Sequence, residues 1–433
     1  MKIYSFPRGG IHFEDSTVPS RDTSVTAFLP GLSVIPMIQH SGKRASPTVS
    51  VGDQVREGML IGQGQGPGSA NIHATVPGRV VRQVFWKTPE GHANDALVIR
   101  MEGAFEKLGK REESFSWKGL SSQDLRNIIS DYGIVEMEMP GRPVSEMISG
   151  FKAGAESLAL VVRCVFDDPW LAADYTLCRE RLGAVAEGSA ITAKAAGANR
   201  ILFAVSHREQ NLGAKLLAEA EQWDLPASLV LVGSRYPQRN RRELELVLRV
   251  YEKKENTSLG DLLILNPAAL AAVHDAVKFQ KPILDRYIAV GGSAVKAPQV
   301  IKARIGTRLK EIFAECGGFV GTPKCIASGS PLHGRMVTDL DEPVIKTTTA
   351  VFALHNACLG GKQSRGCISC GECRFVCPVG LDPEELYKRS LITGKKGGIG
   401  RAGECHGCGC CEVVCPSRLP LSTAIIHYAR GED

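Results

Sequence analysis

The chain has 433 residues, of which 43% are hydrophobic and 23% are charged, as in an ordinary globular protein. Its length allows about three domains, each with its own core. The net charge of +6 is small and no basic stripe with interleaved aromatic residues is present, which excludes nucleic-acid binding. The longest apolar runs, Leu158–Val165 and Leu262–Val273, are too short to span a bilayer, and the N-terminus lacks the apolar core of a signal peptide. We therefore expect a cytoplasmic protein without transmembrane segments.

Residues 1–110 contain short β-like runs separated by Gly and Pro. Val49–Gly62 alternates apolar and polar residues with glycines at the turns, and His73–Val80 has the same character. This pattern predicts a flattened β-sandwich, a barrel-sandwich hybrid of the biotinyl/lipoyl type. No lysine stands at a hairpin tip between its halves, where a swinging cofactor is attached, so we expect this domain to be structural.

Residues 120–275 change to an alternation of apolar strands and helical segments, which predicts an α/β domain whose sheet is covered on its faces. The predicted strands are Leu158–Cys164, Ile201–Val205 and Leu229–Val232, and the predicted helices lie around Leu177–Ala196 and Asn211–Gln222.

Residues 280–355 predict a smaller unit. A strand at Tyr287–Val290, a turn at Gly291-Gly292 and a helix near Arg308–Cys316 resemble a β-grasp fold of the SLBB type, and Lys324–Leu354 is again β-rich. A plain extension of the α/β domain is the alternative.

Residues 356–433 contain two cysteine runs of one form, Cys-x2-Cys-x2-Cys-x3-Cys-Pro, which begin at Cys367 and Cys405. In bacterial-type ferredoxins this run binds two 4Fe-4S clusters, and the fourth cysteine ligates the cluster of the other run. The pattern therefore predicts a dicluster ferredoxin domain with two ligand sets: Cys367, Cys370, Cys373 and Cys415 for cluster 1, and Cys405, Cys408, Cys411 and Cys377 for cluster 2.

Zinc is the alternative for these cysteines, because Cys-x2-Cys pairs also build zinc ribbons. Three cysteines at a spacing of three recur twice, however, which favours iron-sulfur clusters. Cys410 breaks the spacing and stays outside the assignment. The scattered cysteines are predicted to be small buried hydrophobic residues: Cys164, Cys178, Cys316, Cys325 and Cys358.

Basic residues gather around the runs, at Lys388, Arg389, Lys395, Lys396, Arg401 and Arg418. They form either a solvated loop or a docking surface for an acidic redox partner or anionic lipid headgroups.

Several short motifs, taken with the cysteine runs, resemble RnfC, a component of the Rnf electron-transport complex, over nearly the whole chain. These motifs are Gly9-Gly10-Ile11-His12, Val51–Val55, Tyr236-Pro237-Gln238, Ala294–Pro298 and Arg304–Thr307. The resemblance implies a peripheral subunit on the cytoplasmic face of the inner membrane, bound to membrane subunits of an ion-translocating oxidoreductase (translocase). In that family electrons pass between NADH and ferredoxin or flavodoxin. The α/β domain is similar to the flavoprotein subunit of complex I, which binds FMN and NADH.

The flavin loop departs from the family pattern Gly-x-Gly-Gly-Ala-x-Phe-Pro. Between Gly133 and Gly141 this chain carries Glu136 and Glu138, where glycine N–H groups must approach a phosphate. Two like charges about 4 Å apart repel by about 4 kcal/mol at an effective dielectric near 20, which Arg142 offsets only in part. Two further loops depart as well, at residues 163–170 and at Arg239, where the family has an Asn followed by Glu-Cys-Glu-Pro-Tyr and a Gly, respectively.

These departures make FMN a doubtful cofactor. Our leading hypothesis is an RnfC-like subunit that retains two 4Fe-4S clusters and has lost its NADH-oxidising site, so that a ferredoxin, a flavodoxin or a cytochrome supplies single electrons. The first alternative is an FMN-dependent NADH dehydrogenase module with unorthodox loops. The second is a soluble flavin-dependent reductase that resembles cobalamin reductases.

Overall fold

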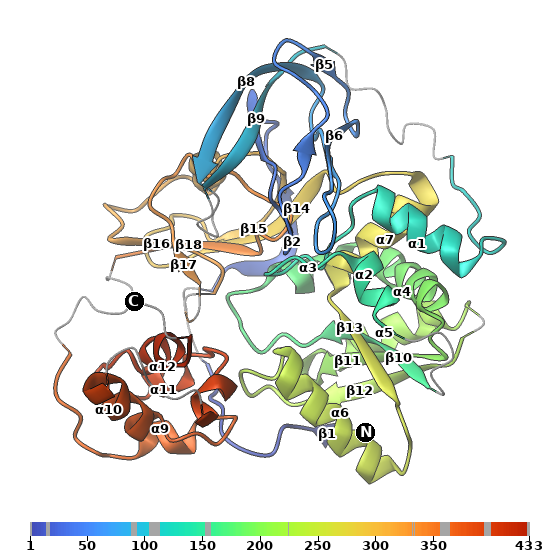
Figure 1. The fold of residues 1–433 in the computed structure, drawn as a ribbon. Coiled ribbons are helices and arrows are strands. Elements are labelled where there is room, and N and C mark those ends of the chain that lie inside the picture. Colours follow the sequence, from blue (N-terminus) through green and yellow to red (C-terminus); the bar gives the residue numbers. More distant parts are fainter. Residues whose placement is uncertain are drawn as a thin grey trace.

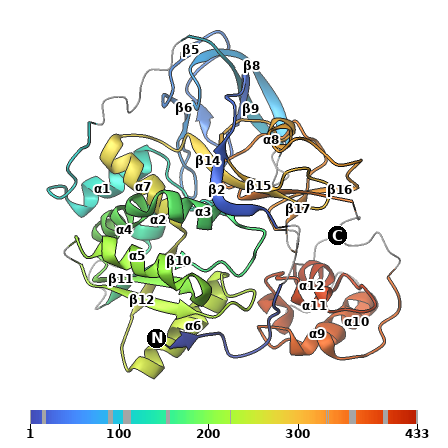
Figure 2. The same cartoon turned by 180° about the vertical axis from the view of Figure 1, so that it is seen from behind.

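The computed structural model describes residues 2–13, 18–87, 93–103, 113–151, 157–223, 225–330, 332, 334–355, 364–393 and 400–430. Within these ranges the strands form sheets of five, six, four and three members. Figures 1 and 2 show a β-sandwich at one end, a β-rich unit in the middle, and an α/β domain that extends to the other end, where the helical unit with the cysteine runs lies beside it. The multidomain fold class expected from the sequence is thereby confirmed.

The α/β domain has a fully parallel sheet in the order β1-β12-β11-β10-β13. Strands β11 and β10 are nearly continuous apolar runs buried on both faces, as is typical of parallel strands. One face packs against α1, α3, α4, α5 and α7, and the other against α6. The elements are β1 (Ile3–Tyr4), β10 (Leu158–Cys164), β11 (Arg200–Ser206), β12 (Ala227–Val232), β13 (Asp261–Leu265), α1 (Ser122–Asp131), α2 (Val144–Ser149), α3 (Ala173–Glu180), α4 (Leu182–Ala196), α5 (Gln210–Ala220), α6 (Arg241–Glu255) and α7 (Pro267–Phe279).

All three strands predicted for this domain are confirmed, but one predicted helical segment is divided, and one apolar run contains two elements. The helix expected over Leu177–Ala196 is two helices, because Arg181 between them has the non-helical angles φ −126° and ψ 36°. The apolar run Leu262–Val273 divides into β13 and α7 at Asn266, whose side chain accepts a hydrogen bond from the N–H of Ala269 (2.9 Å) and so caps α7.

The β-rich unit confirms the expected small fold, with α8 packed on a mixed sheet in the order β17-β16-β18-β14-β15-β2. Strand β2, from the N-terminal region, extends this sheet next to β15, just as β1 extends the α/β sheet. The bounds are β2 (Ser20–Thr26), β14 (Asp285–Gly291), β15 (Gln299–Arg304), β16 (Cys325–Ser328), β17 (Arg335–Met336), β18 (Ala350–Leu354) and α8 (Leu309–Glu315).

The sandwich has two sheets, β3-β9-β8-β5 and β4-β6-β7, around an apolar core. It is fixed to the β-rich unit, where Val34 N–H donates to Gly306 O (3.0 Å) and the Thr75 hydroxyl donates to Ile305 O (2.6 Å). Its strands are β3 (Leu32–Pro36), β4 (Ser46–Pro47), β5 (Gln54–Val55), β6 (Leu60–Gln63), β7 (Ile72–His73), β8 (Gly78–Lys87) and β9 (Ala93–Met101).

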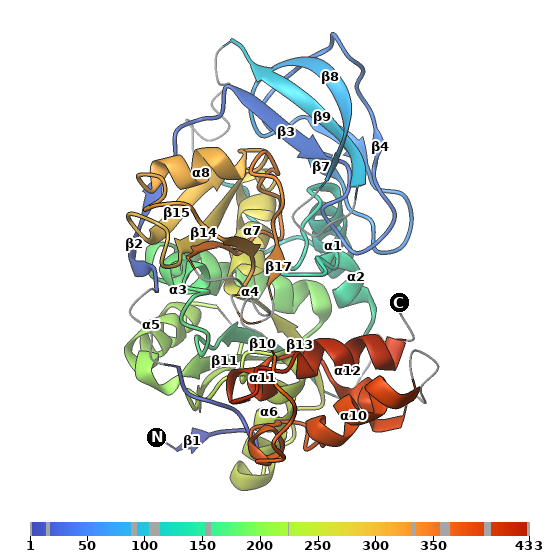
Figure 3. The ribbon, with the colours of Figure 1, turned by 90° about the vertical axis from the view of Figure 1, so that its left-hand side faces the viewer.

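The cysteine-run unit repeats one motif, a short helix within each run followed by a longer helix. Figure 3 shows it beside α6 of the α/β domain. Its elements are α9 (Glu372–Phe375), α10 (Pro383–Thr393), η3 (Gly400–Glu404), α11 (Cys410–Val413) and α12 (Leu421–Arg430). In the part of the chain that the structure describes, no helix combines the length and apolarity needed to cross a membrane.

Candidate metal centre and adjoining pocket

The two cysteine runs have the same backbone geometry. Gly371 (φ 81°, ψ −9°) opens α9, and Gly409 (φ 77°, ψ −6°) opens α11 in the same way. Each glycine stands between the second and third cysteine of its run, in a left-handed conformation that other residues rarely adopt. The chain can therefore reverse there, so that the cysteines before and after the glycine come to the same side.

The predicted ligands of cluster 2 line one cavity. Cys377 from the first run lies there with Cys405, Cys408 and Cys411 from the second, and Leu381 and Ile425 supply apolar wall. The N–H of Leu381 points to the Cys377 sulfur (3.3 Å), the kind of contact that stabilises a cluster thiolate. The crossing of the fourth cysteine, expected from the sequence, fits this arrangement.

Cys410 has a role that the sequence did not indicate. It is fully buried and donates a hydrogen bond from its thiol to Cys408. This bond lowers the pKa of Cys408 to about 7, while the pKa of Cys410 is raised far above the usual thiol range. Cys410 is thus a neighbour that donates to the sulfur of a predicted ligand.

The predicted ligands of cluster 1 differ in exposure. Cys373 is buried and packs with Cys415 against Leu419 and Leu421, whereas Cys367 and Cys370 are exposed. Among the described residues, no group of three or more His, Cys, Asp or Glu side chains is placed to hold a single metal ion. The assignment of ligands to the two clusters therefore stays a prediction, and the donor chemistry of the eight cysteines fits 4Fe-4S clusters.

The cysteines outside the runs follow the prediction in part. Cys164, Cys178 and Cys316 are free and buried. Cys325 is buried as predicted, but it is disulfide-bonded, which the sequence analysis did not anticipate. Cys358, Lys395 and Lys396 lie outside the described residues.

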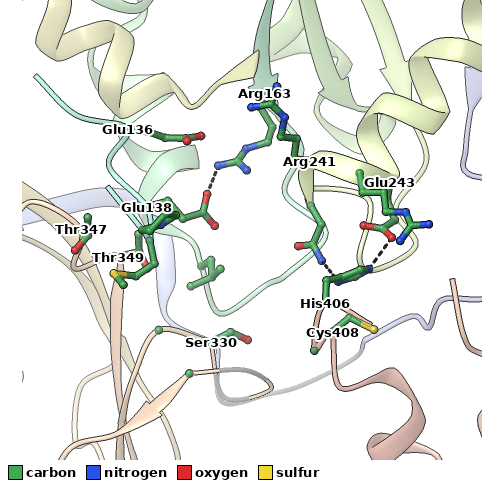
Figure 4. Close-up of a pocket in the computed structure, with 18 of the residues that line it drawn as sticks. Glu136, Glu138, Arg163, Arg241, Glu243, Ser330, Thr347, Thr349, His406 and Cys408 are labelled. Atoms are coloured by element: carbon green, nitrogen blue, oxygen red, sulfur yellow. Dashed lines mark hydrogen bonds and ion pairs between the residues drawn. The ribbon is translucent and has the colours of Figure 1, made fainter. Parts of the chain in front are cut away.

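The second cysteine run docks on helix α6 and the turn before it. His406 contacts the buried carboxylate of Glu243 (2.8 Å) and the side-chain amide of Asn240 (3.3 Å), as Figure 4 shows. The hydroxyl of Tyr236 donates to the carbonyl of Cys408 (2.8 Å). The loop that carries cluster 2 ligands is therefore fixed directly to the α/β domain.

Two motifs that carried the family resemblance meet at this joint. Gly10 N–H donates to Val376 O (2.8 Å), and Ile11 N–H donates to Tyr236 O (3.0 Å). A Cβ atom on Gly9 would lie 2.6 Å from the carbonyl carbon of Cys377. The glycines therefore allow the N-terminal segment to pass between the first run and the Tyr236 turn, a role that sequence reasoning missed.

A pocket of about 620 Å³ opens where the three units meet, within the usual size range of ligand sites. His406 and Cys408 form one wall, and Glu136 and Glu138 form the opposite one (Figure 4). The α/β domain, the β-rich unit and the cysteine-run unit all contribute to its lining, with Arg142, Arg163, Asn240, Arg241, Arg242, Ser328, Ser330, Arg335, Thr347 and Thr349 among the polar residues.

The loop expected to hold the FMN phosphate is closed on itself. Glu136 N–H donates to Arg142 O (2.8 Å), and Gly141 N–H donates to Glu138 O (2.8 Å), so these backbone donors are already used. A Cβ atom would meet Asn71 O at 2.1 Å from Gly133 and the Thr347 methyl at 2.8 Å from Gly141. Both glycines therefore accommodate a close approach of the protein's own chain, and the N–H groups of Glu136 and Gly141 are not free to bind a phosphate.

The three departing loops form one ion-pair network. Glu138 pairs with Arg163 and also with Arg239 (3.2 Å), both of whose side chains are only 7% exposed. Arg163 donates to the carbonyl of Arg239 (3.2 Å), and Arg239 N–H donates to Asp167 (3.0 Å). The sequence had assigned partial compensation of these carboxylates to Arg142. Arg142 does compensate Glu136 in part, and Glu138 is in addition paired with Arg163, 25 positions away, and with Arg239.

Glu136 lies in the same pocket wall as Glu138, and burial influences its carboxyl group. Burial raises the pKa of its carboxyl, and the neighbouring Arg163 opposes that rise. At this wall the chain therefore presents two carboxylates, the half-buried Glu136 and the ion-paired Glu138. A flavin site presents free N–H donors at such a position.

Comparison with known proteins gives three family-model matches in chain order. They are an RnfC barrel sandwich hybrid domain (residues 5–104), a Nuo51 FMN-binding domain (residues 129–275) and an SLBB domain (residues 287–337).

Curated relatives include the C component of the ion-translocating oxidoreductase complex of Rhodobacter capsulatus, 30% identical over 88% of this chain and 74% of that protein. The C component of the proton-translocating ferredoxin:NAD(+) oxidoreductase complex of Clostridium ljungdahlii is also 30% identical, over 88% of this chain and 83% of its own. Among solved structures, an NAD+-reducing [NiFe]-hydrogenase in the air-oxidized state aligns with a TM-score of 0.51 at 12% identity, over 85% of this chain and 76% of that one. At that identity the likeness shows the shared fold alone.

Proposed function

The chain belongs to the RnfC family, the C component of ion-translocating oxidoreductase complexes, and from this premise we propose that it is a one-electron subunit without the flavin site of its family. It is a component of an oxidoreductase complex. In our proposal it lies peripherally on the cytoplasmic face, against membrane subunits, and exchanges electrons with a carrier such as ferredoxin, flavodoxin or a cytochrome.

The cysteine-run unit supports the one-electron part of this proposal. A bound 4Fe-4S cluster takes up and releases one electron at a time. Eight cysteines hold the two clusters in our assignment, and Cys377 lies in the cavity of the second run as the crossed ligand pattern requires. Cys410 and the N–H of Leu381 direct hydrogen bonds at ligand sulfurs, which stabilises their thiolate form.

The ion-pair network of Glu138, Arg163 and Arg239 supports the second part of the proposal, which is the loss of the flavin site. NADH releases two electrons together as a hydride, and a flavin is needed to convert them into single electrons. In this chain the phosphate loop is closed and the three loops around it are joined by buried ion pairs. We therefore propose that this chain does not oxidise NADH directly.

Flavin and iron assays on one purified sample test the proposal. We expect about eight irons per chain from two 4Fe-4S clusters, less than a tenth of a flavin, and no NADH-dependent reduction of a dye. We also expect the broad visible absorbance to bleach in air. Stoichiometric FMN with NADH-dependent dye reduction would refute the loss of the flavin site, and a colourless zinc protein would refute the clusters.

One observation favours a second candidate, the NADH dehydrogenase activity of a flavin-binding module. The match to the Nuo51 FMN-binding domain spans residues 129–275, and the pocket beside Cys408 has room for a ligand. The same flavin assay separates the two candidates. Copurification with membrane subunits separates both from a soluble reductase.

A further inference from the structure

The two cysteine runs differ in how the residue after their first cysteine is covered. His406, after the first cysteine of the second run, contacts Glu243 and Asn240 and has a side chain only 26% exposed. Its counterpart in the first run is Ile368, which is 67% exposed. The α/β domain thus covers His406, and no described residue covers Ile368 in the same way, whereas Phe375 and its counterpart Val413 are both exposed.

The open face carries apolar side chains beside exposed ligand positions. Cys367 and Cys370 are exposed, whereas their counterparts Cys405 and Cys408 are half-buried. Phe375 is 77% exposed, and its ring lies 4.0 Å from where a Cβ atom on Gly371 would stand, next to Cys370. Exposed aromatic and aliphatic side chains grouped around one point are typical of protein-binding surfaces.

The charged side chains near this face fall into two groups, those in ion pairs within the unit and those without a described ion pair. The carboxylates of Asp382, Glu384 and Glu385 are paired with basic residues of the same unit: Arg374, Lys388 and Arg389. Arg365 and Arg418 are exposed and have no ion-pair partner among the described residues. They lie together, since Arg365 N–H donates to Ser417 O (3.0 Å). Glu372 is the carboxylate on α9 for which no ion pair is described.

We propose that an acidic one-electron carrier protein docks on this surface, which we call the first-run face and define by Arg365, Cys367, Ile368, Cys370, Phe375 and Arg418. The inference rests on the proposed function and names where its partner binds. Apolar contacts at Ile368 and Phe375 supply affinity, and the two arginines attract carboxylates of the carrier. The carrier is oxidised by one electron and this chain is reduced by one, with no proton or group transferred.

Binding of an oxidised acidic ferredoxin to the cluster-loaded protein tests this inference, with affinity measured at two salt concentrations. Phe375→Ser should weaken binding at least tenfold, a loss of about 1.4 kcal/mol, because truncating a central interface aromatic costs about 2 kcal/mol or more. Arg418→Glu should weaken binding about tenfold and flatten the salt dependence, and Glu372→Gln should strengthen it. Phe28→Ser and Arg82→Glu are matched controls, since both side chains are exposed on other units and should change affinity less than twofold.

Each alternative result identifies another occupant and overturns the proposal. Unchanged affinity in Phe375→Ser and in Arg418→Glu would remove the first-run face from carrier binding. Tighter binding of Arg418→Glu to a basic cytochrome would indicate a basic carrier. Protection of the face only in the membrane complex, with no ferredoxin binding, would indicate a fixed subunit. Iron content checks that each variant is folded. Failure here leaves the flavin assay untouched, so the two proposals fail separately.

Discussion

The ion-pair network of Glu138, Arg163 and Arg239 can be tested through the stability of the α/β domain. We consider Glu138→Ala, which removes the carboxylate shared by Arg163 and Arg239. Both arginines are almost fully buried, so the variant leaves two charges in a medium of low dielectric.

The expected loss follows from what each arginine retains. Removing one partner of a buried ion pair costs roughly 3–5 kcal/mol. Arg163 keeps its hydrogen bond to the Arg239 carbonyl, and Arg239 keeps Asp167 nearby. We therefore expect a loss near the lower limit, about 3 kcal/mol. Glu138→Gln keeps the shape and loses only the charge, so it should lose about half as much.

Urea unfolding monitored by tryptophan fluorescence measures this loss, because Trp117, Trp170 and Trp223 belong to the α/β domain. A triple variant, Glu138→Leu with Arg163→Met and Arg239→Met, should recover most of the stability, because apolar replacement of a whole buried ion group is often neutral or stabilising. A loss below about 1 kcal/mol in Glu138→Ala, a value typical of surface pairs, would refute the reasoning. So would a triple variant less stable than the single one.

The remaining predictions concern the clusters, the interdomain joint and a buried lysine. Cys370→Ser and Cys408→Ser should each remove the EPR signal of one cluster and leave much of the other; two intact signals after either change would contradict the ligand assignment. Gly9→Ala should release the cysteine-run unit to limited proteolysis, because its Cβ would clash with Cys377, whereas Gly31→Ala, with open space around it, should not. Burial lowers the pKa of Lys346 to about 7. Because the unfolded lysine titrates higher, wild-type stability should rise by up to about 1.4 kcal/mol per pH unit from pH 7 to pH 10. The urea midpoint of Lys346→Met should lack this rise, and equal pH slopes would contradict the prediction.

Local patterns in the sequence were sufficient for much of the fold and for the candidate cluster site. The spacing of each cysteine run is set within a dozen residues, so the runs indicated their metal chemistry without tertiary information. The strands at Leu158–Cys164 and Ile201–Val205 were predictable because a buried parallel strand is one apolar run. The break at Arg181 was not, since it divides one continuous helical pattern.

The sequence by itself determined which residues are present in the cluster runs and in the altered flavin loops. Only the tertiary structure decided which of them act together. Glu138, Arg163 and Arg239 come from three segments, and their pairing depends on how β10 and the loops around it pack. The same holds for the Gly9-Gly10 passage, whose contacts depend on atoms distant in the chain. Periodicity reports burial of a segment, whereas ion pairs and close backbone approaches depend on the position of each side chain in three dimensions.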